Sequence, residues 1–217
     1  MKFENQTILI TGGAQGIGFA LSKKFSVMGA NVVIADIHKD TPNIAKNFGG
    51  FGYICDVTRE EELNNFITFA EDRLGGVHCF ISNAGKIFVD PDHIASASNK
   101  TWELSWKLHV MSHVYAAKYL LPNMINRNQG YFLQIISAAA LLSQIGDAAY
   151  SASKSAALSF AESLAINNGH LGIKVSAVCP QYIATPMLGM DKDNFTKNKN
   201  LISTQTAARR ILSLIHI

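Results

Sequence analysis

The stretch that decides the fold is residues 7 to 18, TILITGGAQGIG. Its first five residues are apolar or β-branched and predict a short strand, and the glycines after them predict a tight turn into a helix. Glycine lets backbone N–H groups approach a phosphate closely, and a helix N-terminus carries partial positive charge. The spacing is G-x-x-x-G-x-G, which differs from G-x-G-x-x-G and lacks the lysine of a P-loop. The stretch therefore predicts a strand–turn–helix unit suited to a nucleotide phosphate.

Five more β-branched runs follow, separated by longer helical patterns. Most are apolar on both faces, as strands covered by helices on each side must be. This alternation predicts right-handed βαβ units and a doubly wound parallel sheet of Rossmann type, with helices on both faces. The six expected strands are TILIT (7–11), NVVIAD (31–36), FGYICDV (51–57), VHCFIS (77–82), YFLQIIS (131–137) and IKVSAV (173–178).

Some of the predicted helices carry signals for where they begin or end. Gly29 follows GFALSKKFSVM and is expected to cap the first helix at its C-terminus. Thr58 and Glu61 match the S/T-x-x-E capping box and are expected to open the helix at 59–74. The stretch 188–204 is polar and irregular, and it is the candidate for a long mobile loop.

The composition is that of one large α/β domain in a reduced compartment. The chain has 217 residues, 48% hydrophobic and 16% charged, which is enough to bury one sizeable core. Its apolar runs are far shorter than the roughly 20 residues of a membrane span, and no signal peptide is evident. The net charge of +3 comes from scattered basic residues, so no nucleic-acid partner is expected. Isolated Cys55, Cys79 and Cys179 favour a cytoplasmic location.

Asp36 strengthens the nucleotide interpretation, because it closes the second predicted strand. Ligands bind at the carboxyl ends of strands in such sheets. A carboxylate there accepts hydrogen bonds from both ribose hydroxyls of an adenosine and repels a 2′-phosphate. The cofactor predicted is therefore NAD rather than NADP. The alternative is an ordinary turn between strand and helix, followed by a surface aspartate.

Residues 148–154, AAYSASK, place Tyr150 and Lys154 on one face of a predicted helix. Taking hydride from a secondary alcohol requires a base for the hydroxyl proton, and carbonyl reduction requires the same group as an acid. A nearby ammonium favours phenolate, so Lys154 is expected to lower the pKa of Tyr150. Ser137 ends the fifth predicted strand and is expected to hold the substrate oxygen near the Tyr150 hydroxyl. The alternative is a surface contact between two long side chains.

Two other motifs are not expected to function. Ser151 to Lys154 reads S-x-x-K, the nucleophile motif of serine acyl-transfer enzymes, but S-D-N and K-T-G are absent from the chain. His109 and His113 form H-x-x-x-H without the glutamate of H-E-x-x-H and without an evident third ligand, so no metal site is predicted.

Together these motifs resemble the short-chain dehydrogenase/reductase family, and the resemblance covers nearly the whole chain. The matching pieces are TGGAQGIG (11–18), DV (56–57), NAG (83–85), Ser137, YSASK (150–154) and PQYIATPM (180–187). The resemblance implies that Asp56 holds the adenine and that the NAG turn supports the sheet beside the cofactor. It also implies that Thr185 contacts the nicotinamide carboxamide and that Lys154 bonds the nicotinamide ribose.

The sequence therefore predicts an NAD(H)-dependent oxidoreductase acting on a secondary alcohol or ketone. The alternative is a nucleotide-binding regulator that kept the fold and lost turnover. The expected catalytic residues are Ser137, Tyr150, Lys154 and His109, and the expected cofactor-binding residues are Gly12, Gln15, Gly16, Ile17, Gly18, Asp36, Asp56, Val57, Asn83, Ala84, Gly85, Tyr150, Lys154, Pro180, Ile183 and Thr185.

Three positions depart from the family pattern. His109 stands where the family usually has an asparagine that orders a water in a proton relay. The imidazole is either a replacement ligand for that water, with its own pH dependence, or a partly buried structural histidine. Gln181 stands where the family favours glycine and either tunes the substrate pocket or obstructs the cofactor, and Ile136 stands where serine often precedes Ser137.

The C-terminal residues and the subunit contacts complete the prediction. The family continues into a seventh strand, whereas this chain ends in LSLIHI, which one reading frame of a sequencing-library transposon end encodes. We predict one domain over 1–211 and a non-native tail over 212–217, with the last strand missing. By analogy, helices at 101–126 and 149–167 would form a homodimer or homotetramer in the full-length parent. Residues 138–146, Tyr182 and 188–204 would frame the substrate pocket.

Overall fold

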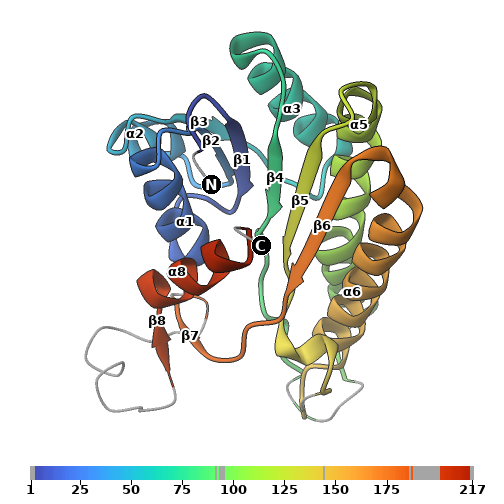
Figure 1. Ribbon diagram of the computed structural model, residues 1–217. Coiled ribbons are helices and arrows are strands. Elements are labelled where there is room, and N and C mark those ends of the chain that lie inside the picture. The colour runs from blue at the N-terminus through green and yellow to red at the C-terminus, as the bar shows by residue number, and fades with distance from the viewer. Residues whose placement is uncertain are drawn as a thin grey trace.

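A central parallel sheet carries helices on both of its faces in the computed structural model, which describes residues 3–90, 92, 96–143, 145–185, 187 and 201–215 (Figure 1). The strand order is β3-β2-β1-β4-β5-β6. The strands are β1 Thr7–Thr11, β2 Asn31–Asp36, β3 Phe51–Ile54, β4 Cys79–Ser82, β5 Gly130–Ile135 and β6 Ile173–Val178. All six strands expected from the sequence are confirmed, and the doubly wound architecture with them.

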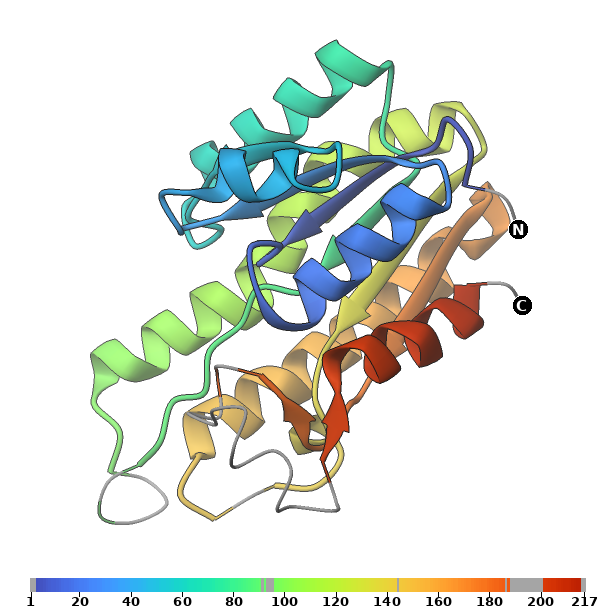
Figure 2. The same cartoon turned by 90° about the vertical axis from the view of Figure 1, so that its left-hand side faces the viewer.

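The helices lie in two layers, one on each side of the sheet (Figure 2). The helical elements are α1 Gly16–Val27, α2 Thr41–Lys46, α3 Glu60–Leu74, α4 Asn99–Trp106, the π-helical segment η1 Lys107–Met111, α5 Ser112–Asn126, the 3₁₀ turn η2 Ala138–Ala140, α6 Ala148–Asn168, the 3₁₀ turn η3 Gly169–Leu171 and α8 Thr204–Ile215. Two short strands, β7 Ile183–Ala184 and β8 Ile202–Ser203, pair in parallel outside the main sheet.

Alternate residues of each strand fill the two cores. Ile8 and Ile10 of β1 pack with Leu21 and Phe25 of α1 on one face. Leu9, between them, packs on the other face in the core that α3 and α5 complete. This alternation follows from the two-residue period of a strand, and it explains why the strands are apolar on both faces.

The strand order reverses between β1 and β4, and this point positions the site. β1 pairs with β2 on one side and with β4 on the other, all in parallel. The connections after β1 and β4 therefore leave in opposite directions and open a crevice at the carboxyl ends of the strands, where ligands bind in such sheets.

Of the two capping predictions, one is confirmed and one is wrong. Gly29 follows the α1 C-cap Met28 with φ +85°, and its N–H donates to the Ser26 carbonyl. Thr58, by contrast, does not cap α3, whose N-cap is Arg59 and has no side-chain cap hydrogen bond. The Thr58 hydroxyl instead donates to Asp56 Oδ1 at 2.8 Å, and the same oxygen accepts the Thr58 N–H at 2.9 Å.

The C-terminal part of the described chain packs against its beginning. Helix α8 lies beside α1 (Figures 1 and 2), and its Leu212 and Ile215 are buried in the same core as Phe3 and Phe25. Residues 188–200 of the predicted loop lie outside the described residues, while Ile202 and Ser203 form β8.

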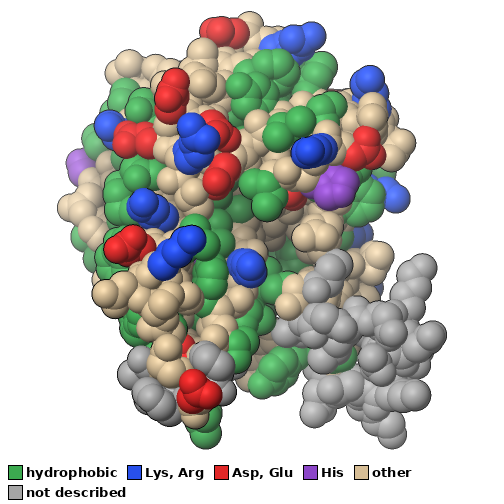
Figure 3. Space-filling model, turned by 180° about the vertical axis from the view of Figure 1, so that it is seen from behind, with side chains coloured by type: hydrophobic (Ala, Val, Ile, Leu, Met, Phe, Trp, Pro, Cys, Tyr) green, Lys and Arg blue, Asp and Glu red, His purple; other side chains and the backbone are tan. Residues whose placement is uncertain are grey.

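Surface charge is mixed on the face turned away from the viewer in Figure 1. Figure 3 shows basic and acidic side chains interspersed on that face, which agrees with their scattering along the sequence. Within the described ranges, no helix has the length and apolar character needed to cross a bilayer.

Candidate active site

A cavity of about 770 Å³ opens at the carboxyl ends of the strands. Every residue that the sequence analysis predicts for cofactor or chemistry lines this cavity, except Gly18 and His109. Its volume lies within the range of sites that enclose small molecules and cofactors. The structure thus brings together residues from positions 12 to 185 of the chain in one hollow.

The glycine turn forms one wall of the cavity. Gly12 and Gly16 have φ of +64° and +59°, a region that side-chain-bearing residues rarely adopt. A Cβ on Gly12 would lie 2.9 Å from the Ala84 Cα, and a Cβ on Gly18 would lie 2.2 Å from the Gly12 carbonyl oxygen. Gly18 therefore lets the helix pack against the turn, and Gly12 lets the turn pack against Ala84. A Cβ on Gly16 would meet only Thr185 atoms, at 3.5 Å and beyond, so at this residue the turn can face a phosphate.

The NAG turn is fixed to the end of β1 by hydrogen bonds. The Asn83 side-chain amide donates to the carbonyls of Thr11 and Gly12 at 2.9 and 3.0 Å. The Thr11 hydroxyl oxygen accepts from the backbone N–H groups of Asn83 and Ala84 at 3.0 and 3.1 Å. Sequence reasoning missed Thr11, because its partners lie about 70 residues away and the sequence gives no sign of that contact.

Two half-buried carboxylates line the same end of the cavity. Asp36 accepts the Ala14 N–H on Oδ2 at 3.0 Å and the His38 N–H on Oδ1 at 3.1 Å, so its orientation beside the glycine turn is set by backbone donors. Asp56 accepts both the N–H and the hydroxyl of Thr58 on one oxygen. Thr58 also lines the cavity and was not predicted to do so.

At the other end of the cavity, Ser137, Tyr150 and Lys154 lie together. Ser137 follows β5 as the N-cap of η2, and its Oγ accepts the Ala139 N–H at 3.1 Å. Tyr150 and Lys154 lie in the first turns of α6, with exposed fractions of 8% and 3%, and Lys154 Nζ is 5.7 Å from the Tyr150 ring centroid. The pair is therefore buried in the site and is not a surface contact.

The pKa of Tyr150 differs from the expectation. Burial raises it above its usual value, with a further rise from the Asp147 carboxylate, while a hydrogen bond with the Ser137 side chain acts in the opposite direction. Lys154 is not among the groups that shift the pKa of Tyr150, and burial lowers the pKa of Lys154 itself to about 8. In this state Tyr150 is therefore a protonated phenol.

His109 lies in η1 next to this end of the cavity but has no exposed surface. Its Nε2 accepts the Lys86 N–H at 3.3 Å, and its Nδ1 lies 2.9 Å from Ser153 Oγ. Its ring meets the Tyr150 ring edge-on, with centroids 5.2 Å apart. Both ring nitrogens have protein partners, which favours the structural interpretation of His109 over a ligand for a relay water.

The other histidine of the H-x-x-x-H motif does not line the cavity. His113 Nδ1 lies 2.9 Å from the Gln134 side-chain oxygen, and burial lowers the pKa of His113 to about 4. Among the described residues no group of three metal-ligating side chains comes together.

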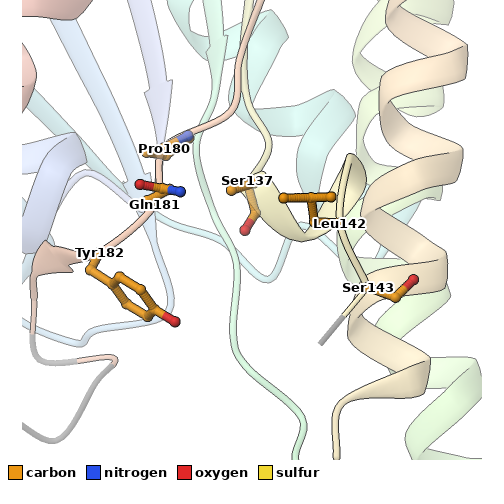
Figure 4. Close-up of a pocket in the computed structure, with 7 residues that line it drawn as sticks. Ser137, Leu142, Ser143, Pro180, Gln181 and Tyr182 are labelled. Carbon is orange, nitrogen blue, oxygen red and sulfur yellow. The ribbon is translucent and has the colours of Figure 1, made fainter. Parts of the chain in front are cut away.

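A smaller pocket of about 180 Å³ adjoins Ser137. Figure 4 shows the Ser137 hydroxyl pointing into the space between Leu142 on one side and Gln181 and Tyr182 on the other. Gln181 also lines the larger cavity, so it lies where the two spaces meet. Apolar residues that sequence reasoning did not single out, including Ile87, Phe88, Leu104 and Leu108, line the larger cavity.

Comparison with known proteins agrees with this architecture. The sequence profile of the family described as short chain dehydrogenase matches residues 6–195. Epidermal retinol dehydrogenase 2 of Mus musculus is 33% identical over 97% of this chain and 71% of its own length. Oxidoreductase UcpA of Salmonella typhimurium is 30% identical over 86% of this chain and 72% of its own length.

A third relative, 7alpha-hydroxysteroid dehydrogenase of Escherichia coli, is 30% identical over 87% of this chain and 75% of its own length. The family profile and the relatives thus agree on the family. The chain belongs to the short chain dehydrogenase family.

Proposed function

We propose that this protein is an NAD(H)-dependent oxidoreductase that transfers a hydride between the nicotinamide and a secondary alcohol or ketone. One observation carries the proposal: a single cavity has the glycine turn and Asp36 at one end and Ser137, Tyr150 and Lys154 at the other. A dinucleotide laid along it would place its adenosine at Asp36 and its nicotinamide beside Tyr150.

The residues present fit a dinucleotide. The glycine turn lines the cavity without bulky side chains at Gly12 and Gly16, so its backbone N–H groups can face the pyrophosphate, and the N-terminus of α1 favours its charge. Asp36 would accept the ribose hydroxyls and repel a 2′-phosphate, which supports NAD over NADP. When bound, the nicotinamide supplies the hydride donor or acceptor, and the protein supplies position and charge.

Ser137 and Tyr150 would bind the substrate oxygen together. The Ser137 hydroxyl faces the pocket (Figure 4), and Tyr150 hydrogen-bonds with Ser137. Because burial keeps the Tyr150 phenol protonated, it is ready to donate a proton to the oxygen of a carbonyl being reduced. For alcohol oxidation the same group would act as the base, with Lys154 as the nearby positive charge that favours phenolate.

The proposed substrate is an apolar alcohol or ketone. Leu142 and Tyr182 border the pocket next to Ser137, and Phe88, Leu104 and Leu108 line the larger cavity. Relatives named for a retinol and for a 7alpha-hydroxysteroid support an apolar substrate for this chain as well.

We also propose a single domain over 1–211, a cytoplasmic location and a homodimer or homotetramer. Trp102, Leu104 and Trp106 are exposed large apolar side chains on α4, within the helical region expected to pair between subunits, and they support the oligomer. The second candidate function is a nucleotide-binding regulator. Gln181 favours it, because its side chain occupies the junction of the two spaces, where the family has glycine.

Fluorescence titration with NADH and NADPH, followed by a screen of apolar secondary alcohols for NADH formation, tests the proposal. We expect tighter binding of NADH than of NADPH, and turnover of at least one alcohol. NADH binding without turnover over a broad panel, including ketones in the reverse direction, would favour the regulator. Replacing Gln181 by Gly in that case shows whether its bulk is the cause.

A further inference from the structure

The interior behind Tyr150 contains a connected set of polar side chains that the proposed chemistry does not use. Ser105 of α4, His109 of η1 and Ser153 of α6 are 0%, 0% and 1% exposed, and none of them lines the cavity. Buried polar groups on three different elements are retained only when they bond one another, and here they do.

The hydrogen bonds assign the tautomer of His109. Because Nε2 accepts the Lys86 N–H at 3.3 Å, that nitrogen carries no proton, and the proton of the neutral ring is on Nδ1. The Nδ1–H then donates to Ser153 Oγ at 2.9 Å, and the Ser153 hydroxyl donates to the Tyr150 backbone carbonyl at 2.8 Å. Ser105, which lies 3.0 Å from Ser153 Oγ, donates to the Ala149 carbonyl at 3.1 Å.

The ring therefore connects the turn at Gly85 and Lys86 with the beginning of α6. One nitrogen holds the turn at Gly85 and Lys86, which lines the cofactor cavity, and the other reaches the backbone of Tyr150 through Ser153. A Cβ placed on Gly85 would lie 3.5 Å from Lys154 Nζ and 3.6 Å from His109 Nε2, so the turn packs between these two nitrogens.

The surroundings of His109 keep it uncharged. Burial and the nearby Lys154 hold the pKa of His109 well below its usual range, with His113 adding to the effect. The groups facing the ring are Tyr150 and Lys154 of α6, Lys86 of the turn and His113 one turn along the helix. A second proton on Nε2 would face the Lys86 N–H and break that hydrogen bond.

The geometry points to His109 as a positioning residue: in its neutral Nδ1–H form it sets the separation between the cofactor-lining turn at Gly85 and the proton donor Tyr150, and the Lys86 N–H together with Ser153 fixes its tautomer. This inference rests on the proposed function for the role of Tyr150. It differs from a water ligand in a relay, because the ring acts through two direct hydrogen bonds to the protein.

Two isosteric variants each remove one of the two hydrogen bonds of His109, either the bond to Lys86 or the bond to Ser153. The amide of His109→Asn can replace Nδ1 but is too short to reach Lys86, whereas the amide oxygen of His109→Gln can replace Nε2 but leaves Ser153 without its donor. We expect His109→Asn to raise the Kd for NADH by about 2- to 10-fold, the value of one lost hydrogen bond. We expect His109→Gln to leave that Kd unchanged and to lower kcat by about 10-fold or more, since Tyr150 is displaced.

Ser153→Ala tests whether both residues act through the same bond. The double variant His109→Gln with Ser153→Ala should lose no more kcat than His109→Gln alone. The matched control is His113→Asn, a buried histidine of α5 that is bonded to Gln134 and does not line the cavity. It should lower thermal stability and leave both the NADH Kd and kcat unchanged.

Nitrogen NMR of the imidazoles measures the tautomer of His109 directly and does not require turnover. We expect His109 as the neutral Nδ1–H tautomer at neutral pH, and a change of tautomer or exchange broadening in Ser153→Ala. An Nε2–H or charged ring overturns the inference, as does a His109→Asn variant with unchanged Kd and kcat, or losses that multiply in the double variant. Absence of turnover in the wild type would refute the proposed function alone, because the Kd and NMR measurements still test the two hydrogen bonds of His109.

Discussion

At the glycine-turn end of the cavity, ligand contacts would come from backbone groups and from half-buried side chains, whereas at the Tyr150 end they would come from side chains that are almost fully buried. Asp36, Asp56 and Asn83 are partly exposed and already bonded to backbone groups of neighbouring turns. Lys154 and His109 have exposed fractions of 3% and 0%. The first end recognises a ligand by shape, and the second holds titratable groups whose pKa values are shifted by burial.

This difference shows where burying a group of the active site lowers the folding stability of the protein. Lys154 is a buried ammonium whose pKa falls to about 8, and the described residues provide no carboxylate in a salt bridge with it. A fall from 10.5 to about 8 corresponds to roughly 3 kcal/mol at pH values below 8. The glycine turn carries no comparable cost, because its polar groups are bonded to backbone groups or open to water.

The largest expected effect comes from removing the proton donor. Tyr150→Phe should lower kcat by about 100- to 10,000-fold, the usual contribution of a general acid, while the Kd for NADH stays unchanged. Steady-state kinetics and NADH titration measure the two. Tyr182→Phe is the control, since that hydroxyl lies on an exposed side chain of the same cavity. A Tyr150→Phe variant that keeps the wild-type kcat would show that Tyr150 is not the proton donor.

The second largest effect is expected from a substitution that changes only the shape of the glycine turn. In Gly18→Ala the new methyl group would lie 2.2 Å from the Gly12 carbonyl oxygen, so the turn must shift. We expect NADH affinity to fall on the order of 100-fold, because the backbone donors of the turn no longer converge on the pyrophosphate.

The control for this shape effect is Gly169→Ala, where no atom lies within 4 Å and φ is −59°. NADH titration and thermal melting are the measurements. Equal NADH affinity in Gly18→Ala and Gly169→Ala would show that the site for the pyrophosphate is not formed by the close packing described above.

Lys154→Met separates chemistry from stability at the buried end. We expect kcat to fall by about 10- to 100-fold, and the free energy of unfolding to rise by up to roughly 3 kcal/mol at pH 7, since a buried charge is replaced by an apolar chain. Denaturant unfolding measures the gain. Lys118→Met is the control, because that exposed ammonium is paired with Glu60 at 2.7 Å and its removal should give no gain.

The pH dependence of this gain has a defined sign. The pKa of Lys154 is lower in the folded protein, about 8, than its ordinary value of 10.5, so the unfolded chain binds the additional proton between these values. The wild type therefore carries the full cost below pH 8 and gains stability as the pH rises from about 8 towards 10.5, which narrows its difference from Lys154→Met. A constant difference between pH 6 and 10 would mean that Lys154 is not buried as a charged group.

The smallest expected effect is on cofactor choice. Asp36→Ser should weaken NADH binding by about 10-fold and strengthen NADPH binding, because a charged acceptor is lost and a 2′-phosphate is no longer repelled. Asp40→Ser removes the same charge from an exposed position that does not line the cavity, and it should change neither affinity. An unchanged ratio of the NADH and NADPH affinities in Asp36→Ser would mean that this carboxylate does not bind the ribose hydroxyls.

The two ends also differ in how far the sequence predicts them. For a glycine or an aspartate that follows a strand, the residue type and its place already indicate a role. Gly12, Gly16 and Asp36 were therefore predicted to be where the structure has them. Thr11 and Ser153 were not, since a buried threonine or serine has no sequence pattern until its partner, far along the chain, is known. The rise that burial causes in the pKa of Tyr150 was not predicted, because spacing shows that Lys154 is near but not how deeply both are buried.

The π-helical segment η1 has a geometric consequence for the whole long helix from Asn99 to Asn126. A π turn closes its hydrogen bond over one residue more than an α turn, so the residues before it are rotated by about 100° relative to a continuous α-helix. Without that additional residue, the face that presents His109 to Tyr150 and the face that presents Leu120 to the sheet would not be in register. A single residue of chain length thus decides which way the histidine points.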